Sequence, residues 1–111
     1  MMNCFIDNRN LRVEFLYAEL DHHISVEVRE ELDAIITEHN IKNIIFDFKN
    51  MKFMDSSGIG VVIGRYKKIA KDGGKVGVIN VSTQVKKIFD LSGMNKIIGV
   101  YNTYEDAVSS F

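Results

Sequence analysis

The chain has 111 residues, of which 46% are hydrophobic and 26% are charged, and its formal net charge is −1. These values are typical of one soluble globular domain, since domains usually contain about 100–200 residues. The 14 basic and 15 acidic residues form no block of like charge, so nothing favours nucleic-acid binding, which depends on clustered Lys and Arg. We therefore expect a single domain over residues 1–111.

Cysteine content and hydropathy indicate the compartment. Cys4 is the only cysteine, so the chain builds no disulfide framework and suits a reducing cytosol. Residues 1–10 carry a charge by position 7 and have no apolar run of signal-peptide length. Because no segment approaches the about 18 consecutive apolar residues of a membrane span, we expect a cytoplasmic protein that makes no membrane contact.

The first half of the chain predicts a hairpin, a helix and a buried strand. CFI (4–6) precedes the turn-prone DNRN, and LRVEFLY (11–17) alternates apolar and polar residues like a half-buried strand. NIIFDF (43–48) is a near-continuous apolar run, typical of a parallel strand covered on both faces. Between them we expect a helix with Ser25 as its N-cap and a buried stripe at helical spacing: Val28, Leu32, Ile35 and Ile36.

The second half alternates helices and strands. A helix from about Ser57 to Lys71 ends at the glycines of DGG (72–74). The elements expected after it are the strand KVGVI (75–79), the helix STQVKKIFDLSGM (82–94) capped by Ser82 or Thr83, the strand KIIGVY (96–101) and a short helix that begins at Thr103.

The order β-β-α-β-α-β-α-β-α indicates an α/β domain with a mixed, mostly parallel sheet, in which the first strand pairs antiparallel at or near an edge. In such sheets functional groups gather where strands pass into helices, at the carboxyl ends of the strands. Two loops of that kind are ELDHH (19–23) and NMKFMDSSGIG (50–60), and the topology predicts that they lie close together.

The glycines of GIGVVIG (58–64) have two interpretations. Their spacing is one residue away from the dinucleotide fingerprint, and the next strand ends at Asn80 where that fingerprint needs an acid. No G-x-x-x-x-G-K-[ST] phosphate loop occurs. We prefer a packing interpretation, in which Gly60 and Gly64 let the helix approach the sheet closely and Gly58 relieves crowding at the helix start.

Nucleophilic and metal chemistry lack their usual patterns. There is no G-x-S-x-G elbow, and only His22, His23 and His39 could activate a serine. The first two are adjacent and cannot both point at one atom, and no further ligands cluster near them. We therefore expect no metal, no cofactor and no catalytic residue, and we expect Asp21 to cap or brace its loop.

Asp55, Ser56 and Ser57 precede the second predicted helix. At least one of them should be its N-cap, satisfying backbone N–H groups that have no helical partner. A serine hydroxyl there is also accessible, and phosphorylation would add roughly −1.5 to −2 charges beside Asp55. On a partner surface that complements the neutral loop, this charge would cost desolvation and repulsion. Such a site is a switch and need not be an enzyme.

Four segments together resemble the anti-sigma-factor antagonists of spore-forming bacteria, which belong to the STAS domain family. They are ELDHH (19–23), FMDSSGIGVVIGRYK (53–67), GGK (73–75) and VKKIFDLSGMNKII (85–98). The combination of LDHH and MDSSG is the most specific part, and it favours the sporulation type that acts in the sigma-F system. The resemblance covers nearly the whole chain and implies a single STAS domain without enzymatic activity.

This resemblance implies a partner-switching mechanism. The unphosphorylated protein would bind an anti-sigma factor that is also a serine kinase, and so free the sigma factor that the kinase holds. The kinase, which itself binds ATP and ADP, would then inactivate the protein by phosphorylating Ser56, with Ser57 as the second choice. A PP2C-type phosphatase would restore the active form.

The resemblance also implies a partner-binding surface on the helix after the serine and on the adjoining loops. The candidate contacts are Asp21, His22, Asp55, Ser57, Gly58, Ile59 and Gly60. Ala18 replaces the usual glycine of the family and should change only the local geometry. Because the polar helix faces offer no apolar stripe for a permanent dimer, we expect a monomer when the protein is free. Two alternatives remain, a stress-response antagonist of another anti-sigma kinase and a small nucleotide-binding protein.

Overall fold

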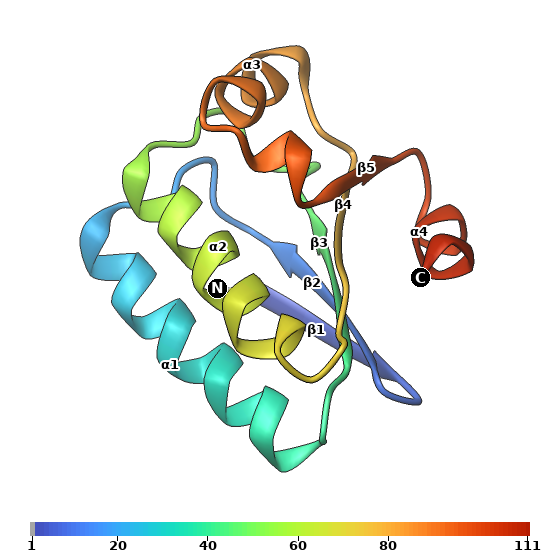
Figure 1. The fold of residues 1–111 in the computed structure, drawn as a ribbon. Coiled ribbons are helices and arrows are strands. Elements are labelled where there is room, and N and C mark those ends of the chain that lie inside the picture. Colours follow the sequence, from blue (N-terminus) through green and yellow to red (C-terminus); the bar gives the residue numbers. More distant parts are fainter. Residues whose placement is uncertain (1) are drawn as a thin grey trace.

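The computed structural model describes residues 2–111 as a five-stranded sheet with helices on both faces (Figure 1). The elements in chain order are β1 (Met2–Asp7), β2 (Asn10–Phe15), α1 (His22–Glu38), β3 (Asn43–Asp47), α2 (Ser56–Ala70), β4 (Val76–Ile79), α3 (Thr83–Leu91), the 3-10 helix η1 (Met94–Lys96), β5 (Gly99–Tyr101) and α4 (Tyr104–Ser110). This order confirms the predicted alternation of strands and helices, to which it adds η1.

The strands lie side by side in the order of the sequence, β1-β2-β3-β4-β5. β1 pairs antiparallel with β2, and each later pair is parallel. The mixed sheet with an antiparallel first strand at its edge is therefore confirmed. Each parallel connection crosses over through a helix, as parallel strands require, so the carboxyl ends of β2, β3 and β4 meet at one edge.

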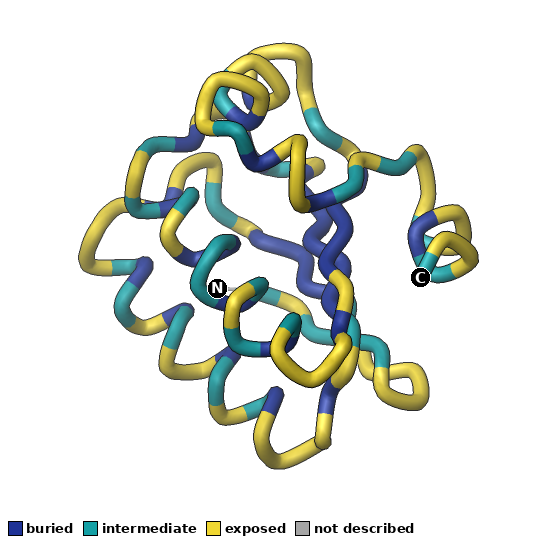
Figure 2. Tube along the Cα trace, viewed as in Figure 1, coloured by how far each residue is buried: buried dark blue, intermediate teal, exposed yellow. Residues whose placement is uncertain are grey.

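The core fills the space between the sheet and the helices α1, α2 and α3. Phe15, Phe46 and Phe48 stack there with ring centroids 5.7 to 6.3 Å apart. Each fully buried large apolar side chain contributes roughly 1.5–3 kcal/mol. α4 covers the opposite face, where a smaller cluster joins Ala107 to Ile45 and Ile79. Figure 2 shows the buried strands between outer helical turns that face the solvent.

Two of the differences from the sequence-based expectations have a clear local cause. Ser25 is not an N-cap but lies buried within α1, because the carboxylate of Asp21 accepts the Ile24 N–H at 2.9 Å and starts the helix earlier. The last strand begins at Gly99, because Gly93 adopts a left-handed φ of 81° and the chain then forms η1.

The packing interpretation of two glycines is wrong. A Cβ placed on Gly60 or Gly64 would meet nothing within 4 Å, because both lie on the side of α2 away from its buried residues. Gly58 does relieve crowding as predicted, since a Cβ there would stand 3.0 Å from Cγ of Met54. Gly60 and Gly64 are therefore not required for contact between α2 and the sheet.

In residues 2–111, no helix combines the length and the apolar character that crossing a bilayer requires.

Candidate functional site

The loops before α1 and α2 meet at the carboxyl edge of the sheet, as the topology predicts. β2 and β3 are hydrogen-bonded neighbours, so the helices that follow them begin side by side and remain in contact. Between their first turns is a hollow of about 230 Å³. Its lining comes from α1 and α2 alone: His22, Ser25, Arg29, Ser56, Ser57 and Gly60.

Backbone hydrogen bonds hold the two loops in register. The carbonyl oxygen of Ala18 accepts from the N–H groups of Lys52 at 2.9 Å and Phe53 at 3.2 Å. The side-chain amide of Asn50 donates to the carbonyl of Phe15 at 2.9 Å. Ala18 is not among the residues with positive φ, so alanine fits at this position without backbone strain. The segment before α2 is thereby tied to the end of β2.

Asp55 caps α2. Its carboxylate oxygen accepts from the N–H of Ser57 at 2.9 Å and from that of Gly58 at 3.5 Å. This confirms that one of the three residues Asp55, Ser56 and Ser57 is the N-cap. Because Asp55 satisfies these donors, neither serine hydroxyl is needed as a cap. In the same way, the cap of α1 is Asp21, which is exposed beside the hollow and does not line it.

The serines differ in exposure. The Ser56 residue is exposed and Ser57 is half-buried, although both line the hollow. Gly58 is buried against Met54, and Ile59 is half-buried and packs on the core. Of the predicted site residues, His22, Ser56, Ser57 and Gly60 therefore line one hollow. Asp21 and Asp55 cap the two helices, and the remaining two pack beneath the start of α2.

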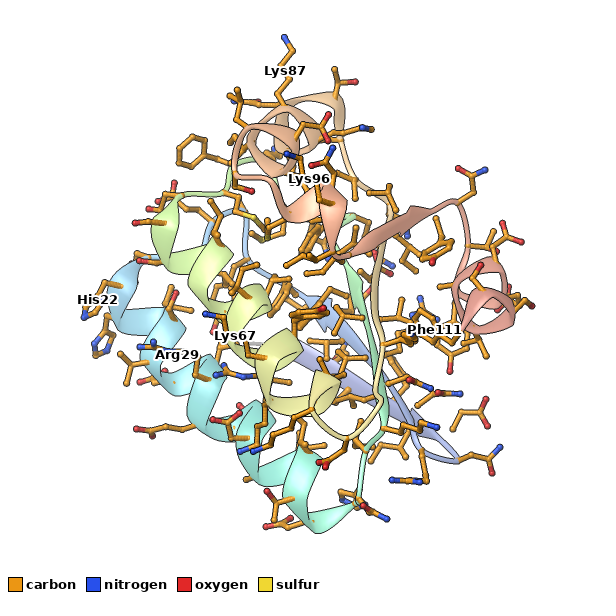
Figure 3. The ribbon with its side chains drawn as sticks, in the orientation of Figure 1. His22, Arg29, Lys67, Lys87, Lys96 and Phe111 are labelled. Carbon is orange, nitrogen blue, oxygen red and sulfur yellow. The ribbon has the colours of Figure 1, made fainter. Side chains whose placement is uncertain are left out.

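Sequence reasoning missed several residues at this end of the molecule. Arg29 lines the hollow (Figure 3), and its seven-residue spacing from His22, which places both on one helix face, could have indicated this. Leu91 is 88% exposed at the end of α3, and Leu16 and Phe53 are also exposed. For Leu91 the signal was an apolar residue outside the inward stripe of its helix.

The carboxylate at the end of β3 is already occupied. Asp47 is fully buried and accepts from Arg12 at 3.2 Å, from the Lys49 N–H at 3.0 Å and from the Asn80 amide at 3.0 Å. This side chain therefore joins neighbouring strands. Over residues 2–111, no three His, Cys, Asp or Glu side chains are placed to hold a metal ion.

Comparisons with known proteins agree on one family. The family model described as STAS domain matches residues 8–107. The chain is 39% identical over 102 residues to an anti-sigma F factor antagonist from Paenibacillus polymyxa, which covers 92% of this chain and 87% of the relative. It is 30% identical to an anti-sigma-B factor antagonist of Bacillus subtilis, with 81% of each chain covered.

The fold resembles solved structures of the same kind of protein. The unphosphorylated anti-sigma factor antagonist SpoIIAA superposes with a TM-score of 0.84 at 28% identity, covering 99% of this chain and 95% of that one. Its phosphorylated form from Bacillus gives a TM-score of 0.75 at 28% identity, covering 99% and 98%.

Proposed function

This chain belongs to the STAS domain family, and on that premise we propose that it is an anti-sigma factor antagonist controlled by phosphorylation of Ser56. Unphosphorylated, it binds an anti-sigma factor that is also a serine kinase and frees the sigma factor. In the kinase, the Ser56 oxygen attacks the γ-phosphorus of ATP, the bond to ADP breaks, and the hydroxyl proton leaves to a base of the kinase. A PP2C-type phosphatase reverses the modification. The ATP chemistry thus belongs to the partner, and this chain is not an enzyme.

The observation that carries this proposal is that Asp55, and not Ser56, caps α2. The Asp55 carboxylate accepts the N–H groups at the start of α2. The hydroxyl of the exposed Ser56 is therefore not needed to cap the helix. A kinase can therefore modify it without unfolding the helix. Ser57 is the second choice because it is half-buried.

The partner surface that we propose is the edge around the hollow. The contacts carried by the resemblance are Asp21, His22, Asp55, Ser57, Gly58, Ile59 and Gly60. The exposed side chains of Leu16, Phe53 and Leu91 add apolar area at the same end of the molecule, and apolar side chains desolvated at an interface contribute to affinity. A phosphate at Ser56 would place about −1.5 to −2 charges in this surface.

The specific pathway is also part of the proposal. Higher identity to an anti-sigma F factor antagonist than to an anti-sigma-B factor antagonist supports the sporulation type, which promotes sigma-F transcription. The nucleotide-binding alternative is disfavoured because Asp47 is occupied by its own fold and the sequence lacks a phosphate loop.

The test uses the purified protein, its cognate anti-sigma kinase and ATP. We expect mass spectrometry to find one added phosphate, which Ser56→Ala abolishes and Ser57→Ala, the matched control, retains. Ser56→Asp should weaken binding to the kinase at least tenfold, measured by calorimetry, because it adds charge to the interface. Full phosphorylation of Ser56→Ala, or unchanged affinity of Ser56→Asp, would contradict the site or the charge mechanism respectively.

A further inference from the structure

Of the six residues that line the hollow, Arg29 is the one whose side chain carries a permanent positive charge. It lies on α1 at the face that also carries His22 and Ser25, opposite the first turns of α2. Figure 3 shows Arg29 on α1 with the α2 ribbon beside it. Helical side chains lean toward the N-terminus of their helix, and for Arg29 that direction leads toward the end of the hollow where α2 begins.

The other cations between these helices are paired, and Arg29 is not. Arg65 and Lys68 lie 3.0 and 3.9 Å from the same Asp33 oxygen, whereas Arg29 has no carboxylate within salt-bridge distance in residues 2–111. Burial lowers the pKa of the Arg65 guanidinium, Asp33 opposes this, and the positive charge of Arg29 lowers that pKa further. The lining of the hollow therefore contains one permanent cation, Arg29, and no carboxylate.

The first turn of α2 offers few free backbone donors to a phosphate on Ser56. Asp55 already occupies the N–H groups of Ser57 and Gly58, and its carboxylate would repel a neighbouring phosphate. A stable position for the phosphate therefore requires a cation away from Asp55. Among the residues that line the hollow, Arg29 supplies a guanidinium, whose planar donors match phosphate oxygens in pairs.

The space between Ser56 and Arg29 is open. Gly60 has no side chain, and a Cβ there would still meet nothing within 4 Å. The hollow of about 230 Å³ exceeds the roughly 30 Å³ that one water occupies in the liquid several times over. A tetrahedral phosphate can therefore turn into the hollow without moving either helix.

We propose that Arg29 positions the phosphate of phosphorylated Ser56, drawing it from the Asp55 side into the hollow between α1 and α2. This inference rests on the proposed function only in taking Ser56 as the modified residue. Phosphorylation then changes the surface twice, because it adds negative charge and fills a hollow that the unmodified protein leaves open. Arg29 is a positioning residue of the phosphorylated state and has no such role in the unmodified protein.

The test installs phosphoserine at position 56 during translation, so it does not depend on the kinase. The second pKa of the phosphate is measured by phosphorus NMR in the parent protein, Arg29→Gln, Arg29→Lys and Lys67→Gln. His22 lines the hollow and Asp55 precedes Ser56 in the chain, and all four proteins retain both. A free phosphoserine has a second pKa near about 6, and a guanidinium close by should lower it by about half a unit to one unit.

We expect Arg29→Gln to raise that pKa by the same amount, Arg29→Lys to recover part of the shift, and Lys67→Gln, which removes an exposed charge from α2, to leave it unchanged. Equal pKa values in the parent and Arg29→Gln phosphoproteins would overturn the proposal. Failure of the kinase to modify Ser56 would refute the proposed function and leave this measurement intact, so the two failures are distinguishable.

Discussion

The beginning of α2 and the turn that follows its end use glycine for opposite purposes. A Cβ on Gly74, after the helix, would stand 2.1 Å from the carbonyl oxygen of Lys42 and 2.8 Å from that of Ile69. A Cβ on Gly60, near its beginning, would meet nothing within 4 Å. The first glycine is required by contacts inside the chain. The second has open space beside it in the free protein.

Charged groups show the same contrast. Asp47 is buried in the sheet and accepts hydrogen bonds from three different residues, whereas Arg29 at the hollow has no carboxylate partner in residues 2–111. Most buried polar groups of a fold are satisfied within it, because a buried unsatisfied group costs free energy. Groups left free beside an open hollow are available to a phosphate or a partner.

The largest effect on stability is expected at Gly74, the glycine that is enclosed by backbone atoms. Gly74→Ala should lower the free energy of unfolding by about 3 kcal/mol or more, because the new methyl group meets backbone atoms that cannot move without shifting β3 or α2. Urea unfolding measures the loss, and Gly64→Ala is the matched control in open space. A Gly74→Ala protein as stable as the parent would show that the turn is not tightly packed.

A smaller difference in stability is expected between variants of the cap residue Asp55 and of Ser56. Asp55→Ala should cost about 1 kcal/mol of stability, because the N–H groups of Ser57 and Gly58 lose their acceptor. Ser56→Ala should change stability by no more than about 0.5 kcal/mol. Thermal or urea unfolding of the two variants checks this difference. Equal losses in the two variants would mean that Ser56 also serves the helix start, which would weaken the case for a free hydroxyl.

The smallest effect on stability, and the sharpest on function, concerns the open glycines. Gly60→Ala and Gly64→Ala should each stabilise the fold by up to about 1 kcal/mol, because alanine is the better helix former and both sites have room. Of the two variants, only Gly60→Ala should weaken binding to the anti-sigma kinase, since Gly60 lines the hollow and Gly64 does not. Calorimetric titration of both variants compares them, and equal affinities would remove Gly60 from the partner surface.

Local patterns predicted much of the fold and part of the site. Alternation in LRVEFLY (11–17) and the apolar run in NIIFDF (43–48) identified β2 and β3, and their order implied that the two loops meet. The cap of α1 was misassigned to Ser25, because both Asp21 and Ser25 are suitable cap residues and only the helix start distinguishes them. A suitable residue type makes capping possible, but the position at which the backbone enters the helix decides which residue caps it.

By itself the sequence determined the α/β class, the succession of strands and helices along the chain and the acid–serine–serine motif at the start of a helix, because periodicity and cap chemistry act over a few neighbouring residues. Only the tertiary structure decided which glycines are enclosed and which are open, since that depends on which side of α2 faces the sheet. It also decided that Arg29 shares a hollow with Ser56, because residues far apart in the chain meet only when two parallel crossovers place their helices side by side.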